Sequence, residues 1–412
     1  MKIKRPHHHI VPQSIRQVLF ASLAALCLTS LAFAQRPEFL FINANVGLCS
    51  VCQPNKNQVL VYSLNTETGQ LSHILGPFFT GGTGVYKNPP GNEVRADQQL
   101  IVNAEGTLLF AVNVDSNSIA VFNINSDGTL TAVSGSPFAS NGPQPASLGL
   151  LEDPNIGNGN SILVVANKDD DPLQPQTGPN LSTFLVSPSG TLTLNTGATV
   201  TLPRGSSPSQ ALIEGGQLAG DLLLGMQYIG TGGHGSLTSY LIGLDGSLSA
   251  QNTVTPPNSG KFFLGEVEID QAVYVGLPDQ DMIGIYHFGS EGTILFNYTI
   301  TASGTKPGWL TANKRRTRLY ASDTGSNSIV VYKTQNIFFP TQLQSFALSS
   351  GSSLGPTKLA LDATESYLFV LAGTTLHTLT LQTDGTLAET IPAHLLPVAA
   401  GTVPTGMATL LK

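Results

Sequence analysis

Charged side chains are scarce in this chain of 412 residues, of which Lys, Arg, Asp and Glu together make up 11%. Surface helices normally carry many charged residues, so this scarcity argues against a helical protein. Only three cysteines are present, which excludes a disulfide-rich scaffold. After residue 34, no apolar run reaches the length of about 20 residues that a membrane-spanning helix needs.

Glycine (43 residues) and proline (26) are abundant, and uncharged side chains supply most of the polarity. This composition favours many short strands joined by turns. Apolar residues make up 41% of the chain, enough for a large core and too many for a disordered protein. We therefore expect an all-β protein.

The first 34 residues have the pattern of a secretion signal. An uncharged apolar run at 18–34 ends in an Ala-Phe-Ala triplet, which is a typical cleavage site. The positive charges before this run are Lys2, Lys4, Arg5 and Arg16. We predict a signal peptide at 1–34 and a single mature domain at 35–412, secreted or periplasmic and without a membrane span. An uncleaved membrane anchor is the alternative.

Removal of the signal would take away four basic residues and no acidic one. That leaves 15 Lys and Arg against 26 Asp and Glu, a net charge of −11. Such a surface repels phosphates, so nucleic acid is not an expected partner. We expect a monomer that binds a small polar ligand or an extracellular partner protein.

The two cysteines of the mature chain, Cys49 and Cys52, are separated by two residues. In an oxidising compartment, the simplest interpretation is a disulfide that closes a small loop. A redox pair would need a helix after the first cysteine, which the sequence does not predict. A zinc site would need further ligands, so we predict a disulfide and no metal here.

A turn of similar sequence recurs along the chain, in forms such as TETGQL, NSDGTL and QTDGTL. Its glycine is found at positions 69, 128, 190, 246, 292 and 385. Tight hairpin turns place a residue at positive φ, which glycine adopts without steric cost. The last interval is nearly twice the others, and 328–346 supplies a unit whose longer turn lacks glycine. The chain therefore contains seven repeats of about 53 residues.

Each repeat has two apolar strands before this turn, an earlier strand often introduced by proline, and a fourth strand after it. LFAVNVDSNSIAVFNINSDGTL at 109–130 and LYASDTGSNSIVVYK at 319–333 contain the second and third strands of two repeats. The mature chain starts with a second strand at 38–44 and ends with a first strand at 403–411. This pattern predicts a seven-bladed β-propeller with four antiparallel strands per blade, closed by pairing of the C-terminal strand with the N-terminal blade. The single tryptophan and the scattered Gly-Gly pairs disfavour WD40 and kelch repeats.

Strand direction places the long loops of such a ring on one face, here called the elaborated face, and the short turns on the opposite, plain face. Long loops on a rigid scaffold are common binding sites. The candidate residues on the elaborated face are Arg95, Asp115, Asp169, Asp170, Asp171, His234 and Asp323. The three consecutive aspartates suit Ca²⁺, but without EF-hand spacing a solvated loop is preferred and no cofactor is expected. His234 has no visible partner for acid–base chemistry.

The start of the innermost strand is found by counting back 11 residues from the aromatic residue of the second strand, or by a Pro-x-X pattern. The predicted channel-mouth residues are Gln99, Ser147, Gln210, Trp309 and Lys358, with Gly406 in the repeat that closes the ring. These side chains suit a polar ligand. They include no evident acid–base pair and no nucleophile.

The phrases around 109–130 and 319–333 resemble the seven-bladed lactonase family, whose members are related to bacterial 6-phosphogluconolactonase, and in part the YVTN-type surface propellers. The resemblance covers essentially the whole predicted mature chain. It implies the propeller fold and a funnel site in which histidine, arginine and glutamate act on a lactone. The family's motif has histidine two residues after a proline of an inner strand, where this chain has Trp309 after Pro307.

We therefore expect an extracytoplasmic binding or interaction scaffold without catalysis. The first alternative is a lactone hydrolase, an enzyme of the carboxylic-ester hydrolase type, whose rearranged site would use Glu266 or Glu268, Arg95 or Arg204, and His234. The second alternative is a calcium-dependent hydrolase, which would require carboxylates from several blades to meet on the axis.

Overall fold

The computed structural model describes residues 36–47, 56–85, 96–169, 178–214, 221–349, 355–398 and 402–412. The predicted signal peptide and the predicted residues Cys49, Cys52, Arg95, Asp170 and Asp171 lie outside these ranges. Pro37–Lys412 is one compact unit. Within the described ranges, no helix has the length and apolar character needed to cross a membrane.

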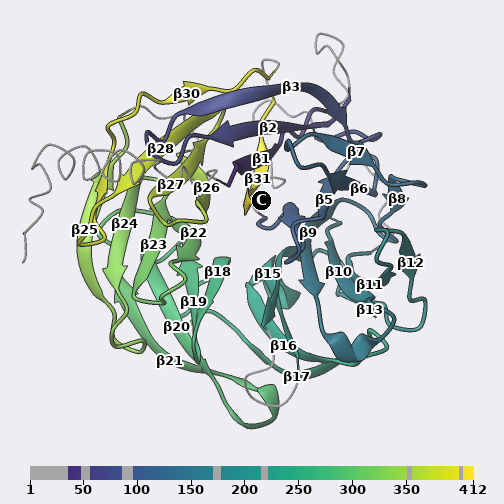
Figure 1. Cartoon of the computed structure of the whole chain (residues 1–412). Helices are drawn as coiled ribbons and strands as arrows, with labels where there is room; N and C mark the ends of the chain where they lie inside the picture. The colour runs from purple at the N-terminus through teal and green to yellow at the C-terminus, as the bar shows by residue number, and fades with distance from the viewer. Residues whose placement is uncertain are drawn as a thin grey trace, which may run out of the picture. The chain divides into compact units, whose positions relative to one another are not determined.

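The strands of this unit form seven antiparallel blades around a central axis (Figure 1). From the axis outward, blade 1 contains β31 (Thr405–Leu411), β1 (Glu38–Asn43), β2 (Gln58–Leu64) and β3 (Leu71–Phe79). Blade 2 contains β4 (Leu100–Val102), β5 (Leu108–Asn113), β6 (Ser118–Ile124) and β7 (Leu130–Ala132). Blade 3 contains β9 (Pro145–Leu151), β10 (Ser161–Asn167), β11 (Asn180–Val186) and β12 (Leu192–Leu194).

The other four blades follow the same order. Blade 4 contains β14 (Ser207–Glu214), β15 (Leu222–Ile229), β16 (Ser236–Ile242) and β17 (Leu248–Val254). Blade 5 contains β18 (Leu264–Ile269), β19 (Ala272–Leu277), β20 (Met282–Phe288) and β21 (Ile294–Thr301). Blade 6 contains β22 (Pro307–Ala312), β23 (Arg318–Asp323), β24 (Ser328–Lys333) and β25 (Thr341–Ala347). Blade 7 contains β26 (Pro356–Leu361), β27 (Tyr367–Ala372), β28 (Thr375–Leu381) and β29 (Leu387–Ala388).

In three blades the outermost strand is split into two short pieces that pair with the same third strand. The second pieces are β8 (Phe138–Ala139), β13 (Val200–Thr201) and β30 (His394–Leu395). Three single-turn helices complete the described structure: η2 (Pro154–Ile156), η3 (Thr231–Gly233) and η4 (Ser290–Gly292). The predicted seven-bladed, four-stranded architecture is confirmed.

Stacking of the blades explains the apolar sequence of the second strands. All six residues of β1, β5, β19 and β27 are buried, because each of these strands lies between two strands of its own blade and faces the neighbouring blades. Such strands are continuous apolar runs, not alternating ones. Between blades 2 and 3, for example, the core joins Phe110 and Val121 to Leu163 and Val165.

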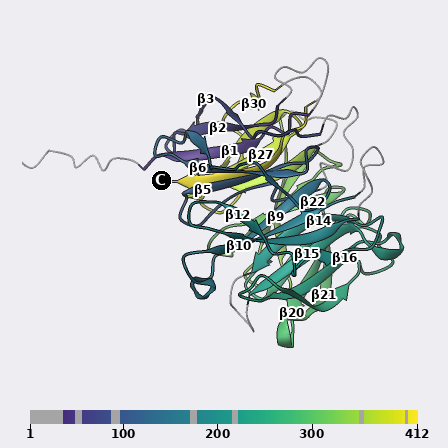
Figure 2. The same ribbon diagram turned by 90° about the vertical axis from the view of Figure 1, so that its right-hand side faces the viewer.

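The ring is closed by the two ends of the chain. β31 pairs antiparallel with β1, from Glu38 opposite Leu411 to Asn43 opposite Thr405. Figures 1 and 2 both show the yellow C-terminal strand beside the purple N-terminal one. The predicted closure by the last strand is therefore confirmed.

The two repeated phrases of the sequence fold into the same turn in blades 2 and 6. Asn113 ends β5, and its amide Nδ2 donates a hydrogen bond to Ser118 Oγ at 3.2 Å. Asp323 ends β23 at the equivalent position, and is fully buried beside Ser326 and Ser328. The two blades share the same turn, but its buried side chain is the amide of Asn113 in blade 2 and the carboxyl of Asp323 in blade 6.

Candidate functional site

Strand register assigns one residue of each inner strand to the upper end of the channel, on the elaborated face. In six of the seven inner strands this residue follows a β-bulge. The seven residues, here called the channel mouth, are Gln99, Ser147, Gln210, Glu266, Trp309, Lys358 and Met407. All five residues predicted for this position lie there. Met407 replaces the predicted Gly406, because Gly406 is the bulged residue of its strand.

Several polar side chains of the channel mouth hold the inner strands together. Gln210 accepts a hydrogen bond from the backbone N–H of Glu266 at 2.8 Å and donates one to its carbonyl oxygen at 2.9 Å. The hydroxyl of Ser147 accepts a hydrogen bond from the N–H of Ala211 at 3.0 Å. These groups join neighbouring blades, so their hydrogen-bonding capacity is largely used within the protein.

Lys358 and Trp309 form a buried pair. The Nζ atom of Lys358 lies 3.5 Å from the centre of the Trp309 ring and donates a hydrogen bond to the carbonyl oxygen of Thr357 at 2.9 Å. Burial lowers the pKa of the Lys358 ammonium to about 7, the Asp97 carboxylate opposes this shift, and Lys168 adds to it. Lys358 therefore exchanges its proton near neutral pH.

Asp97 is carried across the channel by the segment that precedes β4. Its backbone N–H donates to the carbonyl oxygen of Ser209 in blade 4 at 2.9 Å, and the next residue, Gln98, accepts from Leu148 in blade 3 at 3.0 Å. Burial raises the pKa of the Asp97 carboxyl, whereas the Lys358 ammonium and the N–H of Gln98 lower it. A loop of blade 2 thus places a carboxylate within electrostatic reach of blades 5 and 7.

Glu266 is the second carboxyl group of this site and is 2% exposed. Neither of its carboxyl oxygens has a hydrogen-bond partner among the described residues. Burial raises the pKa of Glu266 well above its ordinary value, the backbone of Leu212 opposes the rise, and the Asp97 carboxylate adds to it. The Lys358 ammonium thus opposes the rise in the pKa of Asp97, whereas the Asp97 carboxylate adds to the rise in the pKa of Glu266.

The channel mouth and its border thus hold two carboxyl groups and an ammonium, whereas the sequence pattern placed only the ammonium there. Glu266 was named for the alternative hydrolase, but the sequence pattern did not place it at the channel mouth. The reason is that β18 has no introducing proline and the turn between β18 and β19 is short, with Ile269 opposite Ala272. Glu266 lies eight residues before the aromatic Tyr274, whereas the corresponding interval in blades 2, 6 and 7 is 11 residues. The tight turn at 269–272 was the signal that could have corrected the count. Asp97 lies in a loop, so the pattern of strand residues does not predict its position.

The residues predicted on the elaborated face do not converge on this site through any described contact. Asp115 accepts a hydrogen bond from Thr83 Oγ1 at 3.2 Å, and Asp169 accepts one from the N–H of Gly178 at 2.8 Å. His234 is exposed, and its Nδ1 lies 3.3 Å from the carbonyl oxygen of Gly260. Asp323 belongs to the buried turn of blade 6.

The calcium-dependent hydrolase, and one of the residues considered for the lactone hydrolase, lack the required geometry in the described part of the chain. No described group of three or more His, Cys, Asp or Glu residues is arranged to hold a metal ion, so the carboxylate cluster of a calcium-dependent hydrolase is not found there. Glu268 lies toward the plain-face end of β18. There Arg316 forms salt bridges with Glu268, at 3.8 Å between Nη2 and Oε2, and with Asp270, at 2.6 Å between Nη1 and Oδ1. Glu268 is thus not a channel-mouth residue, because the strand carries it away from Glu266.

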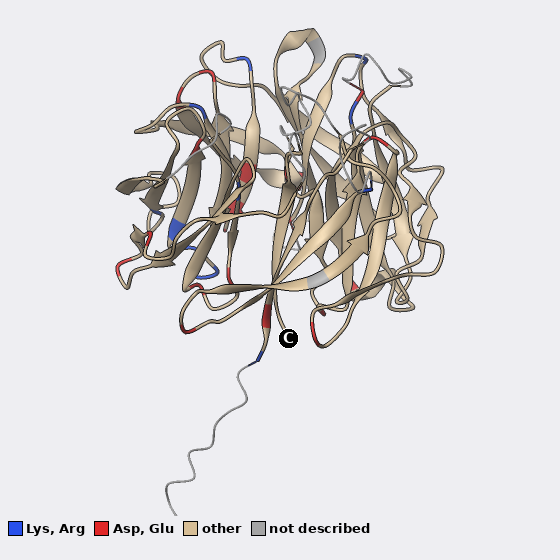
Figure 3. Cartoon of the chain, turned by 90° about the horizontal axis from the view of Figure 1, so that it is seen from above, with Lys and Arg blue, Asp and Glu red and all other residues tan. Residues whose placement is uncertain are grey.

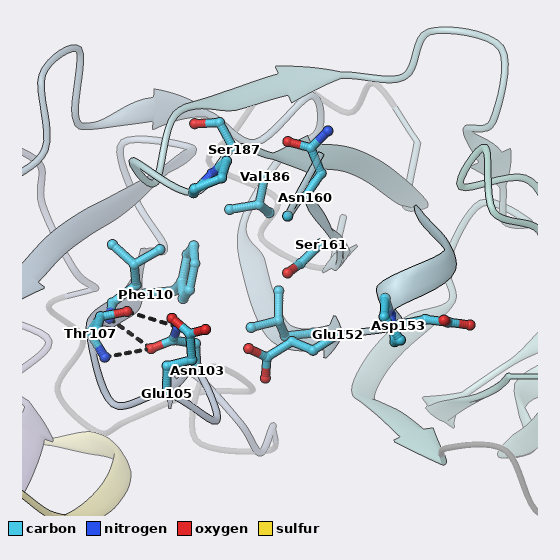
Figure 4. Close-up of a pocket in the computed structure, with 15 residues that line it drawn as sticks. Asn103, Glu105, Thr107, Phe110, Glu152, Asp153, Asn160, Ser161, Val186 and Ser187 are labelled. Atoms are coloured by element: carbon cyan, nitrogen blue, oxygen red, sulfur yellow. Dashed lines mark hydrogen bonds between the residues drawn. The ribbon is translucent and has the colours of Figure 1, made fainter. Parts of the chain in front are cut away.

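A pocket of about 340 Å³ opens on the plain face between blades 2 and 3 (Figure 4). Its polar groups serve their own turns: Asn103 bonds to Thr107 and the adjacent backbone, and Glu152 accepts from the N–H of Ala104 at 2.8 Å. Its ionisable lining residues, Glu105, Glu152 and Asp153, are all acidic. Without a cation or an acid–base pair, this pocket is a weaker candidate than the channel mouth.

Charged residues are few across the whole ring, as Figure 3 shows, so the grouping of Asp97, Glu266 and Lys358 stands out. Burying a charged or ionisable group costs free energy unless it is paired. Three such groups with shifted pKa values at one end of a channel mark a candidate functional site.

No family model and no curated protein matches the sequence. Among solved structures, the chain is similar to a periplasmic gluconolactonase of Pseudomonas aeruginosa (TM-score 0.66, 13% identity, 91% of this chain and 100% of the other). It is also similar to a protein from Lactobacillus plantarum, with a TM-score of 0.65 and 16% identity over 91% of this chain and 100% of the other. A third similar structure is a 6-phosphogluconolactonase candidate from Bacteroides fragilis, with a TM-score of 0.64 and 15% identity over 90% of this chain and 98% of the other. The chain therefore has the fold of the lactonase-like seven-bladed propellers, as its repeated phrases predicted.

Proposed function

We propose that this protein hydrolyses a small lactone at the channel mouth. The observation that carries the proposal is the meeting of Asp97, Glu266 and Lys358, whose pKa values are shifted in directions that suit different roles. Ring opening of a lactone needs a base for water, a positive group for the oxyanion and an acid for the leaving oxygen. The similarity in fold to a gluconolactonase supports the same reaction class.

The roles follow from the environment of each group. The Asp97 carboxylate accepts a proton from a water molecule, whose oxygen forms a bond to the lactone carbonyl carbon. The Lys358 ammonium stabilises the negative charge that develops on the carbonyl oxygen. Glu266 donates its proton to the ring oxygen as the carbon–oxygen bond breaks. The product is a hydroxy acid, and solvent returns the proton from Asp97 to Glu266.

The same assignment predicts the pH dependence of turnover. The rate should rise as Asp97 ionises, above its ordinary pKa of 3.8, and should fall as Lys358 loses its proton at about pH 7. Initial rates between pH 4 and 9, corrected for spontaneous hydrolysis, would measure this profile. A rate that keeps rising above pH 8 would contradict the role of the ammonium.

Substitutions test the proposal directly. We expect Glu266→Gln and Asp97→Asn each to lower kcat/KM about 100-fold, the range that general acid or base catalysis contributes. Proton release from γ-butyrolactone and glucono-δ-lactone, with and without a chelator, is the measurement. Glu268→Gln lies on the same strand outside the channel mouth and should retain activity within about twofold. Absence of turnover in the wild type, or equal rates in all variants, would overturn the hydrolase.

The binding scaffold expected from the sequence is a distinct proposal, which rests on the lengths of the loops in the sequence. It predicts that a lactone or hydroxy acid binds at the channel mouth without turnover. A location outside the cytoplasm is proposed on the N-terminal signal pattern, together with the periplasmic location stated for the similar gluconolactonase. Detection of the mature N-terminus at residue 35 in an exported fraction would test it.

A further inference from the structure

An apolar cluster borders the channel mouth between blades 4 and 5. Tyr228, Leu264 and Trp309 pack together in it, with Ile229 and Phe262 against them and partly exposed. Leu264 and Trp309 connect this cluster, here called the apolar lip, directly to the reactive groups. Leu264 precedes Glu266 by two residues on β18, and the ring of Trp309 makes a cation–π contact with the ammonium of Lys358.

One face of each aromatic ring in the lip is occupied by another side chain. The rings of Tyr228 and Phe262 stack at 4.5 Å with an angle of 3° between their planes. The face of Trp309 is covered by the Lys358 ammonium, and the ring is only 2% exposed. Proteins that bind sugars stack the sugar ring on an open aromatic face, which the lip does not offer through Trp309.

Hydrogen-bonding groups for a sugar are similarly limited. The amide of Gln210 and the hydroxyl of Ser147 already bond to backbone groups of neighbouring blades. Of the remaining groups, Asp97, Glu266 and Lys358 are those that the ring opening itself requires, and Gln99 Oε1 adds one buried acceptor. Polar hydroxyl groups placed against the lip would lose water without gaining partners.

We propose that the substrate is a lactone that carries an alkyl substituent, with its ring at the channel mouth and its chain against the apolar lip. This inference rests on the proposed function and specifies its substrate class. Burial of methylene groups against Phe262 and Ile229 supplies the binding energy, while the ring contacts only the three reactive groups.

The lip is held in place before any ligand arrives. The carboxylate of Asp279 accepts hydrogen bonds from the N–H groups of Lys261 at 2.7 Å and Phe262 at 3.2 Å. The carbonyl oxygen of Lys261 accepts from the N–H of Gly235 at 2.6 Å, which ties the loop before β18 to blade 4. A preorganised apolar surface loses little conformational entropy on binding.

The experiment compares γ-butyrolactone, γ-hexalactone, γ-octalactone and γ-decalactone with glucono-δ-lactone. Binding is measured by calorimetry with the Glu266→Gln variant, which cannot donate the proton and retains the shape of the protonated acid. We expect affinity to rise about twofold per methylene, below the roughly fourfold limit for full burial. Phe262→Ala should abolish this increase, whereas Phe339→Ala, which removes a ring 55% exposed on blade 6, should preserve it.

The outcomes separate this inference from the proposed function. Affinity that is independent of chain length, or tighter binding of glucono-δ-lactone, would overturn the alkyl substrate even if the wild type hydrolyses lactones. Chain-length-dependent binding that Phe262→Ala removes would support the ligand class even if the wild type shows no turnover. In that second case only the hydrolase would fail.

Discussion

A chain that ends at residue 402 is expected to lose its folded ring. The removed segment contains β31, the innermost strand of blade 1, which pairs with six residues of β1. All six residues of β1 are buried, so the backbone groups that face β31 would be left without hydrogen bonds in the core, while those that pair with β2 would keep theirs. The loss should exceed about 5 kcal/mol, comparable to the whole stability of many domains. Urea unfolding followed by far-ultraviolet circular dichroism would measure it.

Two controls make this prediction specific to ring closure. Lys412→Ala removes the hydrogen bonds of Nζ to the carbonyl oxygens of Gly106 and Ile124, keeps the backbone, and should cost about 1 kcal/mol or less. A synthetic peptide of residues 403–412 should restore folding of the truncated chain when added in excess, since an extended peptide can pair with the open edge of β1. A truncated chain as stable as the full one would show that the ring closes differently.

The fold was predictable because the repeated signals are local. The glycine of each hairpin turn adopts a positive φ, as Gly128 does at 82°, and its turn is packed so closely that a Cβ atom would lie 2.5 Å from the Phe39 ring. The buried second strands have apolar residues on both faces in most blades, so their period is visible without a structure. The split blade was visible for the same reason, because its first strand stands alone after the last complete repeat.

The site was only partly predictable because it depends on how the blades are placed in space. Trp309 and Lys358 could be located from the regular spacing of their own blades. Asp97 could not, because its position over the channel depends on backbone hydrogen bonds to blades 3 and 4, which are distant in sequence. The shifts in pKa depend on burial by the complete ring, and no local pattern of residues encodes that burial.

Replacement of Asp323 by Asn is expected to stabilise the protein by about 3 kcal/mol more at pH 8.5 than at pH 5. Asp323 is 0% exposed, and neither carboxyl oxygen has a hydrogen-bond partner among the described residues. Burial raises its pKa from 3.8 to about 7, the backbone of Gly304 opposes the rise, and Asp281 adds to it. An asparagine side chain has no charge to bury, and Asn113 fills the equivalent position in blade 2.

The direction of the pH dependence follows from the raised pKa. The folded protein binds the Asp323 proton more tightly than the unfolded chain does. The resulting stability is present below about pH 4 and is lost as the pH rises through about 7. At about 1.4 kcal/mol per pKa unit, the shift gives a loss of about 4 kcal/mol at most. Other groups titrate in both proteins, so the difference between wild type and Asp323→Asn isolates this residue.

The reciprocal substitution, Asn113→Asp, is the matched control. Asn113 Oδ1 accepts hydrogen bonds from Asn57 Nδ2 at 3.0 Å and Thr80 Oγ1 at 2.5 Å, which a carboxylate would keep. The new charge would still be buried and would lose the amide donor to Ser118, so stability at pH 8.5 should fall by about 1–3 kcal/mol. Opposite signs at two equivalent positions would show that a buried charge, and not the turn itself, limits stability in blade 6. If Asp323→Asn were destabilising at pH 8.5, the carboxylate would have to serve a contact that outweighs its burial.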